Sequence, residues 1–192
     1  MTRALLGLVL LGLVLPAVPP VLAQNTNDPR DAKTTGKSDW EIQEEQRNFN
    51  DGEVALPATP RAENLIEFFP SSASSFRFFV DAASLSVGDG LIRYTLVARS
   101  SSGYDNVSYE GMRCSANMIR VYARLNGSAW SREAASDWKP IPPKTVQRWH
   151  NDLRDRYFCP IHASILTKAE GLDALRRGGH PFASGTGNSE RY

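Results

Sequence analysis

The chain has 192 residues, of which 22 are lysine or arginine and 21 are aspartate or glutamate, giving a formal net charge of +1. A charge balance so close to neutral excludes the strongly basic footprint of proteins that bind nucleic acids or anionic membranes. The length suits one globular domain with extensions at its ends.

The first 23 residues have the layout of a secretory signal peptide. Arg3 precedes the uncharged apolar run "ALLGLVLLGLVL", and Val21 and Ala23 flank a cleavage site before Gln24. A membrane anchor is the alternative, but this run is shorter than the ~20 apolar residues that a spanning helix needs. We therefore expect residues 1–23 to be removed and the mature chain to have no transmembrane segment.

Residues 24–61 are polar and poor in aliphatic side chains. Such a segment buries too little apolar surface to offset the entropy lost on ordering, so we expect a disordered leader. Within it, Trp40, Ile42 and Phe49 stand among charged residues. A short helix that docks on the domain or on a partner is the alternative for this stretch.

The middle of the chain predicts an antiparallel meander of four or five strands. Order begins at "NLIEFF" (64–69), and the following segments combine aromatic and β-branched residues with apolar side chains at every second position. The strands are predicted at residues 76–81, 91–99, 104–114, 118–125 and, returning beside the last, 128–130. Asp89-Gly90 and Asn126-Gly127 are the clearest turns, because these residue types tolerate positive φ.

Two helices are expected after the sheet. In residues 144–157, Val146, Trp149, Leu153 and Tyr157 recur at spacings of three and four, which predicts a helix lying across the apolar face of the sheet. A second helix at 168–177 has a capping box in Thr167 and Glu170, and Gly178-Gly179 ends it. The chain then divides into a signal peptide, a leader, an α+β domain and a short helix with a frayed tail, at residues 1–23, 24–61, 62–165 and 166–192.

Cys114 and Cys159 are the two cysteines of the chain. Both lie beyond the export signal, and an even number in an oxidising compartment favours a disulfide. Their spacing excludes a CxxC redox pair, and neither has histidines nearby at the spacing of a zinc site. We expect the disulfide to fasten the covering helix to the end of a strand.

Residues 64–160 resemble the CNP1-like family of bacterial envelope proteins, named after a cryptic neisserial protein. The likeness lies in "LIEF", "RFFVDAASLSVG", "IRYTLVARSSSGYDNVSYEGMRC", Trp130, Trp138 and "YFCP". This resemblance implies an exported protein of a Gram-negative bacterium, and hence a periplasmic location. It brings no reaction, ligand or catalytic residue that can be carried over.

One face of the predicted sheet is a candidate binding surface. If Ile92, Tyr94, Ile119 and Val121 face the helix, the opposite face gathers six polar side chains: Arg93, Arg99, Glu110, Arg120, Tyr122 and Arg124. Arginine and tyrosine side chains together suit carboxylate, phosphate or sugar recognition. The alternative is a solvated face joined by cross-strand ion pairs, which is ordinary for antiparallel sheets.

The histidines, His150, His162 and His180, match no metal-ligand spacing, and we predict no metal and no cofactor. The sequence predicts a non-catalytic envelope protein that binds another envelope protein or a small anionic ligand. The alternative is a small hydrolase-like enzyme with a site around His150 and Asp152. No serine motif supports that alternative, and a catalytic triad is recognised by geometry rather than by sequence.

Overall fold

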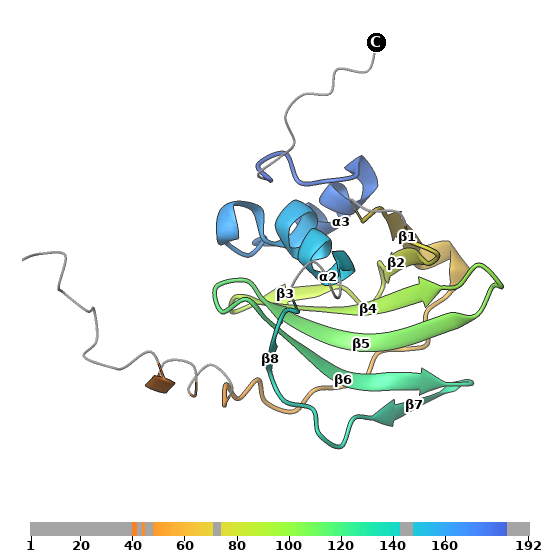
Figure 1. Ribbon diagram of the computed structural model, residues 1–192, viewed down its shortest axis with the longest axis horizontal. Coiled ribbons are helices and arrows are strands. Elements are labelled where there is room, and N and C mark those ends of the chain that lie inside the picture. Colours follow the sequence, from red (N-terminus) through yellow and green to blue (C-terminus); the bar gives the residue numbers. More distant parts are fainter. Residues whose placement is uncertain (1–39, 42–43, 45–47, 71–73, 143–147, 184–192) are drawn as a thin grey trace, which may run out of the picture. The chain divides into compact units, whose positions relative to one another are not determined.

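The computed structural model describes residues 40–41, 44, 48–70, 74–142 and 148–183. One antiparallel sheet dominates it, with strand order β1-β2-β4-β5-β6-β7, while β3 pairs with β4 and β8 pairs with β6 (Figure 1). The strands are β1 (Leu65–Phe68), β2 (Arg77–Asp81), β3 (Ser86–Gly88), β4 (Leu91–Arg99), β5 (Asp105–Arg113), β6 (Met118–Asn126), β7 (Ala129–Arg132) and β8 (Lys139–Pro140). The antiparallel sheet is therefore confirmed, but within the described residues it has eight strands, not the predicted four or five. The additional strands are β1, β3 and β8, which span four, three and two residues, too few to produce a clear alternation.

The Asp89-Gly90 turn follows the sequence prediction, whereas the second turn lies one residue later than predicted, at Gly127 and Ser128, because Asn126 still pairs with Ala129 as the last residue of β6. Asp89 and Gly90 have φ angles of 52° and 70° between β3 and β4, and Gly127 has a φ of 62° between β6 and β7. These left-handed conformations match the right-handed twist of the flanking strands. They fix the register of each hairpin, for example Asn126 opposite Ala129.

The helices follow the sheet in the chain and lie on one side of it (Figure 1). They are α2 (Arg148–Asp152), the π-helix η2 (Leu153–Phe158), the 3-10 helix η3 (Pro160–His162) and α3 (Lys168–Arg177); a further 3-10 helix, η1 (Ala62–Asn64), precedes β1. The start of the predicted 144–157 helix lies outside the described residues. The bounds of α3 match the prediction: Thr167 Oγ1 accepts a hydrogen bond from Glu170 N at 3.1 Å, and Gly178 ends the helix with a φ of 77°.

The main core lies between the sheet and these helices. Ile92 and Tyr94 point into it, as predicted, and meet Leu153, Tyr157 and Phe158 of η2. The disulfide between Cys114 and Cys159 is confirmed, with the two Cα atoms 5.5 Å apart. It joins the residue after β5 to the residue after η2, so it fastens the covering helix to the sheet.

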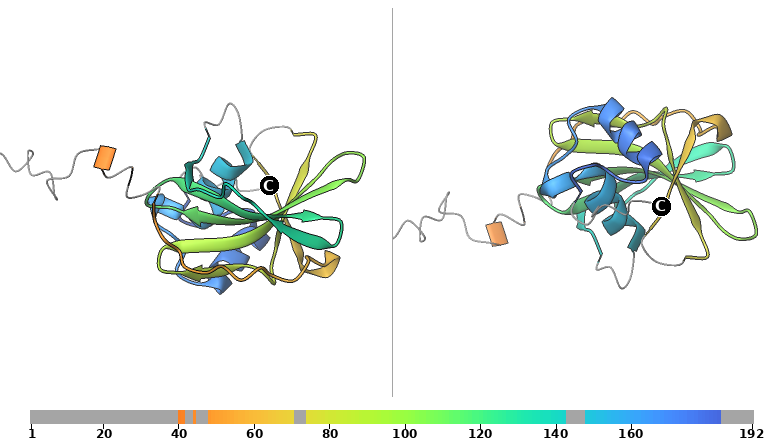
Figure 2. Two further views of the ribbon diagram at one scale, coloured as in Figure 1. Left: turned by 90° about the horizontal axis from the view of Figure 1, so that it is seen from below. Right: turned by 90° about the horizontal axis from the view of Figure 1, so that it is seen from above.

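The opposite face of the sheet is also covered, which the sequence analysis did not predict. Residues 48–61 run along it before the chain enters β1, on the side away from the helices (Figures 1 and 2). Val54 is buried against Tyr109 and Tyr122, and Phe49 packs against the cluster that contains Trp138. The expectation of a disordered leader up to Arg61 is therefore wrong for residues 48–61, because a few apolar anchors and polar contacts hold this otherwise polar segment.

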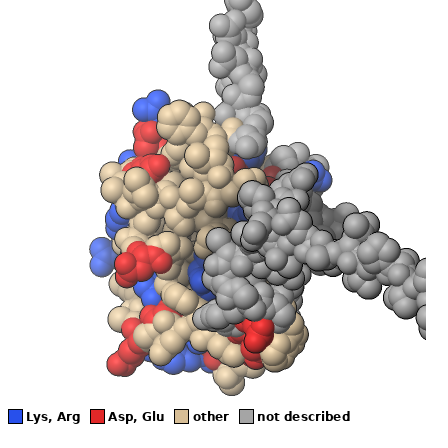
Figure 3. Space-filling view, turned by 90° about the vertical axis from the view of Figure 1, so that its left-hand side faces the viewer, with Lys and Arg blue, Asp and Glu red and all other residues tan. Residues whose placement is uncertain are grey.

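The described surface carries charges of both signs. Figure 3 shows acidic and basic side chains interspersed over one face of the described part. This agrees with the near-neutral composition, since a mixed surface does not attract one sign of polyelectrolyte. None of the described helices has the length and apolar character needed to cross a membrane.

Candidate functional site

Three of the six residues predicted to form a binding face come together on the side of the sheet away from the helices. Arg93 of β4 and Arg120 of β6 both lie opposite Gly111 of β5, which stands between them. Tyr122 lies on the same face, and its ring contacts both guanidinium groups, at 5.9 Å from Arg93 and 5.3 Å from Arg120. The predicted combination of arginine and tyrosine therefore exists at this point.

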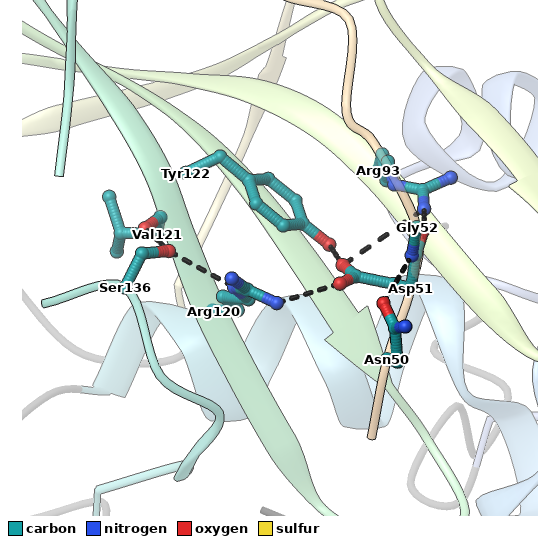
Figure 4. Close-up of polar contacts among 8 residues, drawn as sticks. All are labelled: Asn50, Asp51, Gly52, Arg93, Arg120, Val121, Tyr122 and Ser136. Carbon is teal, nitrogen blue, oxygen red and sulfur yellow. Dashed lines mark hydrogen bonds and ion pairs between the residues drawn. The ribbon is translucent and has the colours of Figure 1, made fainter. Parts of the chain in front are cut away.

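The group that these side chains hold is the carboxylate of Asp51, from the same chain (Figure 4). Arg120 Nη1 donates to Asp51 Oδ1 at 2.7 Å, and the hydroxyl of Tyr122 donates to Oδ2. Arg93 Nη2 donates to the backbone carbonyl of Asp51 at 2.9 Å and lies 4.0 Å from Oδ2. The Asp51 side chain is only 1% exposed, so both carboxylate oxygens are satisfied by protein groups.

Further contacts orient the donors. Arg120 Nε donates to Ser136 Oγ at 3.0 Å, and the Ser136 hydroxyl donates to the carbonyl of Val121 at 2.5 Å (Figure 4). Burial, with the hydrogen bond to Asp51 and its negative charge, raises the pKa of Tyr122 well above its ordinary value. The hydroxyl therefore stays protonated and can donate. The result is a preorganised receptor for one carboxylate.

The same segment is also held through its backbone. We call residues 48–57 the arm. Its carbonyls at Asp51, Val54 and Pro57 accept hydrogen bonds from Arg93 Nη2, Arg132 Nη2 and Trp130 Nε1, at 2.9, 3.0 and 2.9 Å. The donors stand on β4 and β7, so side chains of two separate strands hold the arm at carbonyls three residues apart.

Apolar contacts complete the grip on the arm. Val54 packs on Tyr109 and Tyr122, with Leu56 and Trp130 beside them. At the other end, the ring of Phe49 meets Trp138 edge to face at 6.1 Å. We call the surface that contacts the arm the groove; it consists of Arg93, Tyr109, Arg120, Tyr122, Trp130 and Arg132. Its aromatic side chains make apolar contacts, and its cationic or N–H groups bind carbonyls and a carboxylate. This composition is typical of surfaces that recognise extended peptides.

Gly111 makes the position of Tyr122 possible. A Cβ atom at Gly111 would lie 2.5 Å from the Tyr122 hydroxyl oxygen, much closer than side-chain atoms approach one another. Only glycine leaves room on β5 for the tyrosine ring to lie across this strand between the two arginines.

The other three predicted residues do not join the groove. Arg99 is on the same face but pairs with Asp105, its Nε 2.7 Å from Asp105 Oδ1. Arg124 pairs with Glu133 instead, at 2.7 Å, and lies opposite Ser108 on the helix side of the sheet. Its predicted placement is wrong because the β5–β6 register shifts between Tyr109 and Glu110, which changes the side to which the rest of β6 points.

Glu110 is also on the helix side, so its predicted placement among the arginines is wrong. It is buried, and its Oε2 lies 2.8 Å from His150 Nε2 and accepts from the Tyr94 hydroxyl at 3.1 Å. Its Oε1 accepts from the Ser108 hydroxyl at 2.5 Å. Burial alone would raise the pKa of Glu110, but the charge of His150 and the hydrogen bonds from His150, Ser108 and Tyr94 outweigh it and hold this pKa below its ordinary value.

The order of groups in this cluster bears on the hydrolase-like alternative. In a Ser–His–carboxylate triad the histidine stands between the serine and the acid. Here Glu110 stands between Ser108 and His150, so the histidine is not hydrogen-bonded to this serine as a base would be. The buried Asp152 adds a second carboxylate on the helices, but the arrangement resembles a satisfied polar core more than a nucleophile with its base.

The remaining histidines lie apart from each other. His162 Nδ1 is 3.3 Å from Arg154 Nη2, and His180 Nε2 is 2.9 Å from Glu170 Oε1. Within the ranges that the structure describes, no three histidine, cysteine or acidic side chains come together as metal ligands do.

Asp51, the centre of the groove contacts, was missed by sequence reasoning. Its sequence signal was weak: the apolar residues Phe49, Val54 and Leu56 within a polar stretch.

Comparison with known proteins identifies the family. The model of the CNP1-like family matches residues 44–176, which is most of the chain. The chain belongs to the CNP1-like family. The match begins within the segment assigned to a leader and includes the arm, whereas the sequence analysis placed the start of the domain at residue 62. It also extends through most of α3, past the predicted end of the domain at residue 165.

One curated relative is the Cryptic neisserial protein 1 of Neisseria gonorrhoeae, which is 35% identical over 65 residues. The aligned part covers 28% of this chain and 32% of the relative, so the chain spans about a third of the length of that protein. No solved structure matches the chain.

The Asp51 contacts should contribute measurably to stability. In Asp51→Asn, the buried charge is lost and two arginines keep no carboxylate partner, so we expect the free energy of unfolding to fall by about 1–3 kcal/mol. The matched control is Asp105→Asn, which breaks an ion pair at the exposed end of β4 and should have a much smaller effect. Urea unfolding followed by tryptophan fluorescence measures both, and equal losses would contradict a special role for Asp51.

The Glu110 cluster should make the protein acid-sensitive. Because the folded-state pKa of Glu110 lies below its unfolded value of about 4.3, its contribution to stability is present above that pH and is lost as the pH falls through the folded pKa. Wild type should therefore lose more stability than Glu110→Gln on acidification from about pH 5 to pH 3. Urea unfolding of both proteins across this range tests the sign, and parallel curves would show that Glu110 does not titrate in this way.

Proposed function

We propose that the chain is an exported, periplasmic protein of the cell envelope that acts by binding a partner rather than by catalysis. Two features support export. The apolar run Ala4–Leu15 follows Arg3 and precedes a small-residue cleavage site, as in a signal peptide. The buried Cys114–Cys159 disulfide suits an oxidising compartment, since such bonds persist outside the cytosol.

The main support for a binding function is the way in which the sheet binds the Asp51 carboxylate. Arg120, Tyr122 and Arg93 converge on one acidic residue of an extended segment, and the flanking residues of the groove hold the carbonyls of that segment. Asp51 then acts as the internal occupant of the groove. We infer that the groove recognises an extended peptide that carries a carboxylate, with an aliphatic side chain three residues later, as Val54 follows Asp51.

Binding is favoured over the hydrolase-like alternative by the surroundings of His150. Its Nε2 is already engaged with Glu110, and both side chains are buried beneath the helices. A general base must lie within hydrogen-bond distance of the substrate proton that it abstracts, which a buried His150 does not. The groove, in contrast, has hydrogen-bond donors that directly contact a separate segment of the chain, the arm.

A peptide titration tests the binding function. In the full-length protein with Asp51→Arg, the arm meets like charges in its own groove, so the groove becomes available. We expect a synthetic peptide with the sequence of residues 48–61 to bind this variant, and its Asp51→Asn version to bind at least about tenfold more weakly because the charge-assisted hydrogen bonds are lost. Fluorescence anisotropy of labelled peptides measures both affinities.

Two controls accompany this titration. Wild type should bind the peptide poorly, because its own arm competes at an effective concentration on the order of millimolar. Arg120→Asp should not bind it at all. Equal affinity for the two peptides, or no binding to a folded Asp51→Arg variant, would refute the proposed recognition of a carboxylate.

Export has its own test in a Gram-negative host. We expect the full-length chain to be recovered from the periplasmic fraction with an intact mass that begins at Gln24. Without reductant, neither Cys114 nor Cys159 should react with an alkylating reagent after unfolding. An uncleaved chain in the cytosol with two reactive thiols would contradict the proposal.

A further inference from the structure

The arm is joined to the sheet by a linker that packs loosely. Residues 58–61 connect the arm to η1, and Ala58, Thr59 and Arg61 are exposed. A hollow of about 340 Å³ separates linker from body; its lining includes Pro57, Ala58, Thr59 and Arg61 on one side and Asp81 and Ser84 on the other. The linker therefore buries little surface against the rest of the domain.

The arm can leave the groove without breaking the sheet. The contacts described above reach it from side chains of β4, β5, β6 and β7, and the strand pairings do not include it. Pro60 within the linker and Pro57 just before it favour extended conformations, so the four linker residues can span up to about 14 Å without unfolding a helix or strand.

We propose that the arm exchanges between two copies of this chain, so that residues 48–57 of each copy fill the groove of the other. This inference rests on the proposed function and names the partner as a second copy. The structure shows which sequence fits the groove, and a second copy supplies the same Asp51 carboxylate, the same Val54 and the same three carbonyls. Exchange of an identical element needs no new complementary surface, and it closes as a symmetric dimer.

Concentration decides between the two forms. Within one chain the arm meets its groove at an effective concentration on the order of millimolar, which favours the monomer in dilute solution. The exchanged dimer gains where the protein is concentrated or where the arm no longer fits its own groove. The second condition can be imposed by mutation.

A charge-reversal mixing experiment tests the exchange with full-length proteins. Asp51→Arg places like charges on the arm and groove of one variant, and Arg120→Asp does the same, with the opposite sign, in the other. Within each variant arm and groove repel, but each arm is complementary to the groove of the other variant. We expect each variant alone to be mostly monomeric and the equimolar mixture to form a heterodimer of twice the monomer mass, measured by size-exclusion chromatography with light scattering.

Two controls separate exchange from other association. The double variant Asp51→Arg/Arg120→Asp restores complementarity within one chain and should be monomeric. Asp105→Arg makes the same charge change in the distant Arg99 pair and should not form a heterodimer with Arg120→Asp. If either charge reversal fails to fold, Asp51→Asn replaces the first and the double variant Arg120→Gln/Tyr122→Phe replaces the second; their mixture should then place the intact arm of the latter in the intact groove of the former.

The outcomes distinguish this inference from the function on which it rests. A mixture that stays monomeric, while the 48–61 peptide still binds Asp51→Arg, overturns the exchange and leaves the binding function standing. Failure of both the mixture and the peptide overturns both. A heterodimer that also forms with Asp105→Arg in place of Asp51→Arg would show association unrelated to the arm and would overturn the exchange.

Discussion

The bulge between β5 and β6 is the constraint on which both faces of the sheet depend. At this point β6 has one residue more than β5, so Tyr122 is inserted beside Ala123 on the face away from the helices. Without the extra residue, a strict alternation would carry Arg124 to that face with Arg120 and Tyr122. Gly111, the next residue of β5 after this irregularity, leaves the space into which the tyrosine ring fits.

The two faces use their polar groups differently. Under the helices, Glu110 forms hydrogen bonds with Tyr94, Ser108 and His150 in a closed cluster within the core. On the other face, Arg93 and Arg120 remain about a quarter exposed while the carboxylate between them is almost fully buried. A closed cluster in which every polar group has a partner stabilises the fold and fixes one arrangement of the core. A half-open receptor filled by a segment attached through a loose linker is suited to recognition.

The disulfide and the arm act on the same sheet from its two sides. Cys114 and Cys159 tie the helical layer to the end of β5, so that layer cannot separate from the sheet while the bond is intact. The arm has no such covalent tie and is held by side-chain hydrogen bonds and the packing of Phe49 and Val54. The fold therefore combines one permanently fastened layer with one that depends on noncovalent contacts, and the binding function that we propose uses the second.

Local signals in the sequence determined the elements whose information lies within a few residues. Thr167, Glu170 and Gly178 set the bounds of α3, and Asp89-Gly90 and Gly127 set their turns, because capping and positive φ depend on near neighbours. The even cysteine count sufficed for the disulfide. The tertiary structure alone decided that Asp51 meets Arg120, that Glu110 turns inward to His150 and that Arg124 leaves the groove. Those outcomes depend on a one-residue shift in register and on contacts across 40 to 70 residues of chain, which no local pattern encodes.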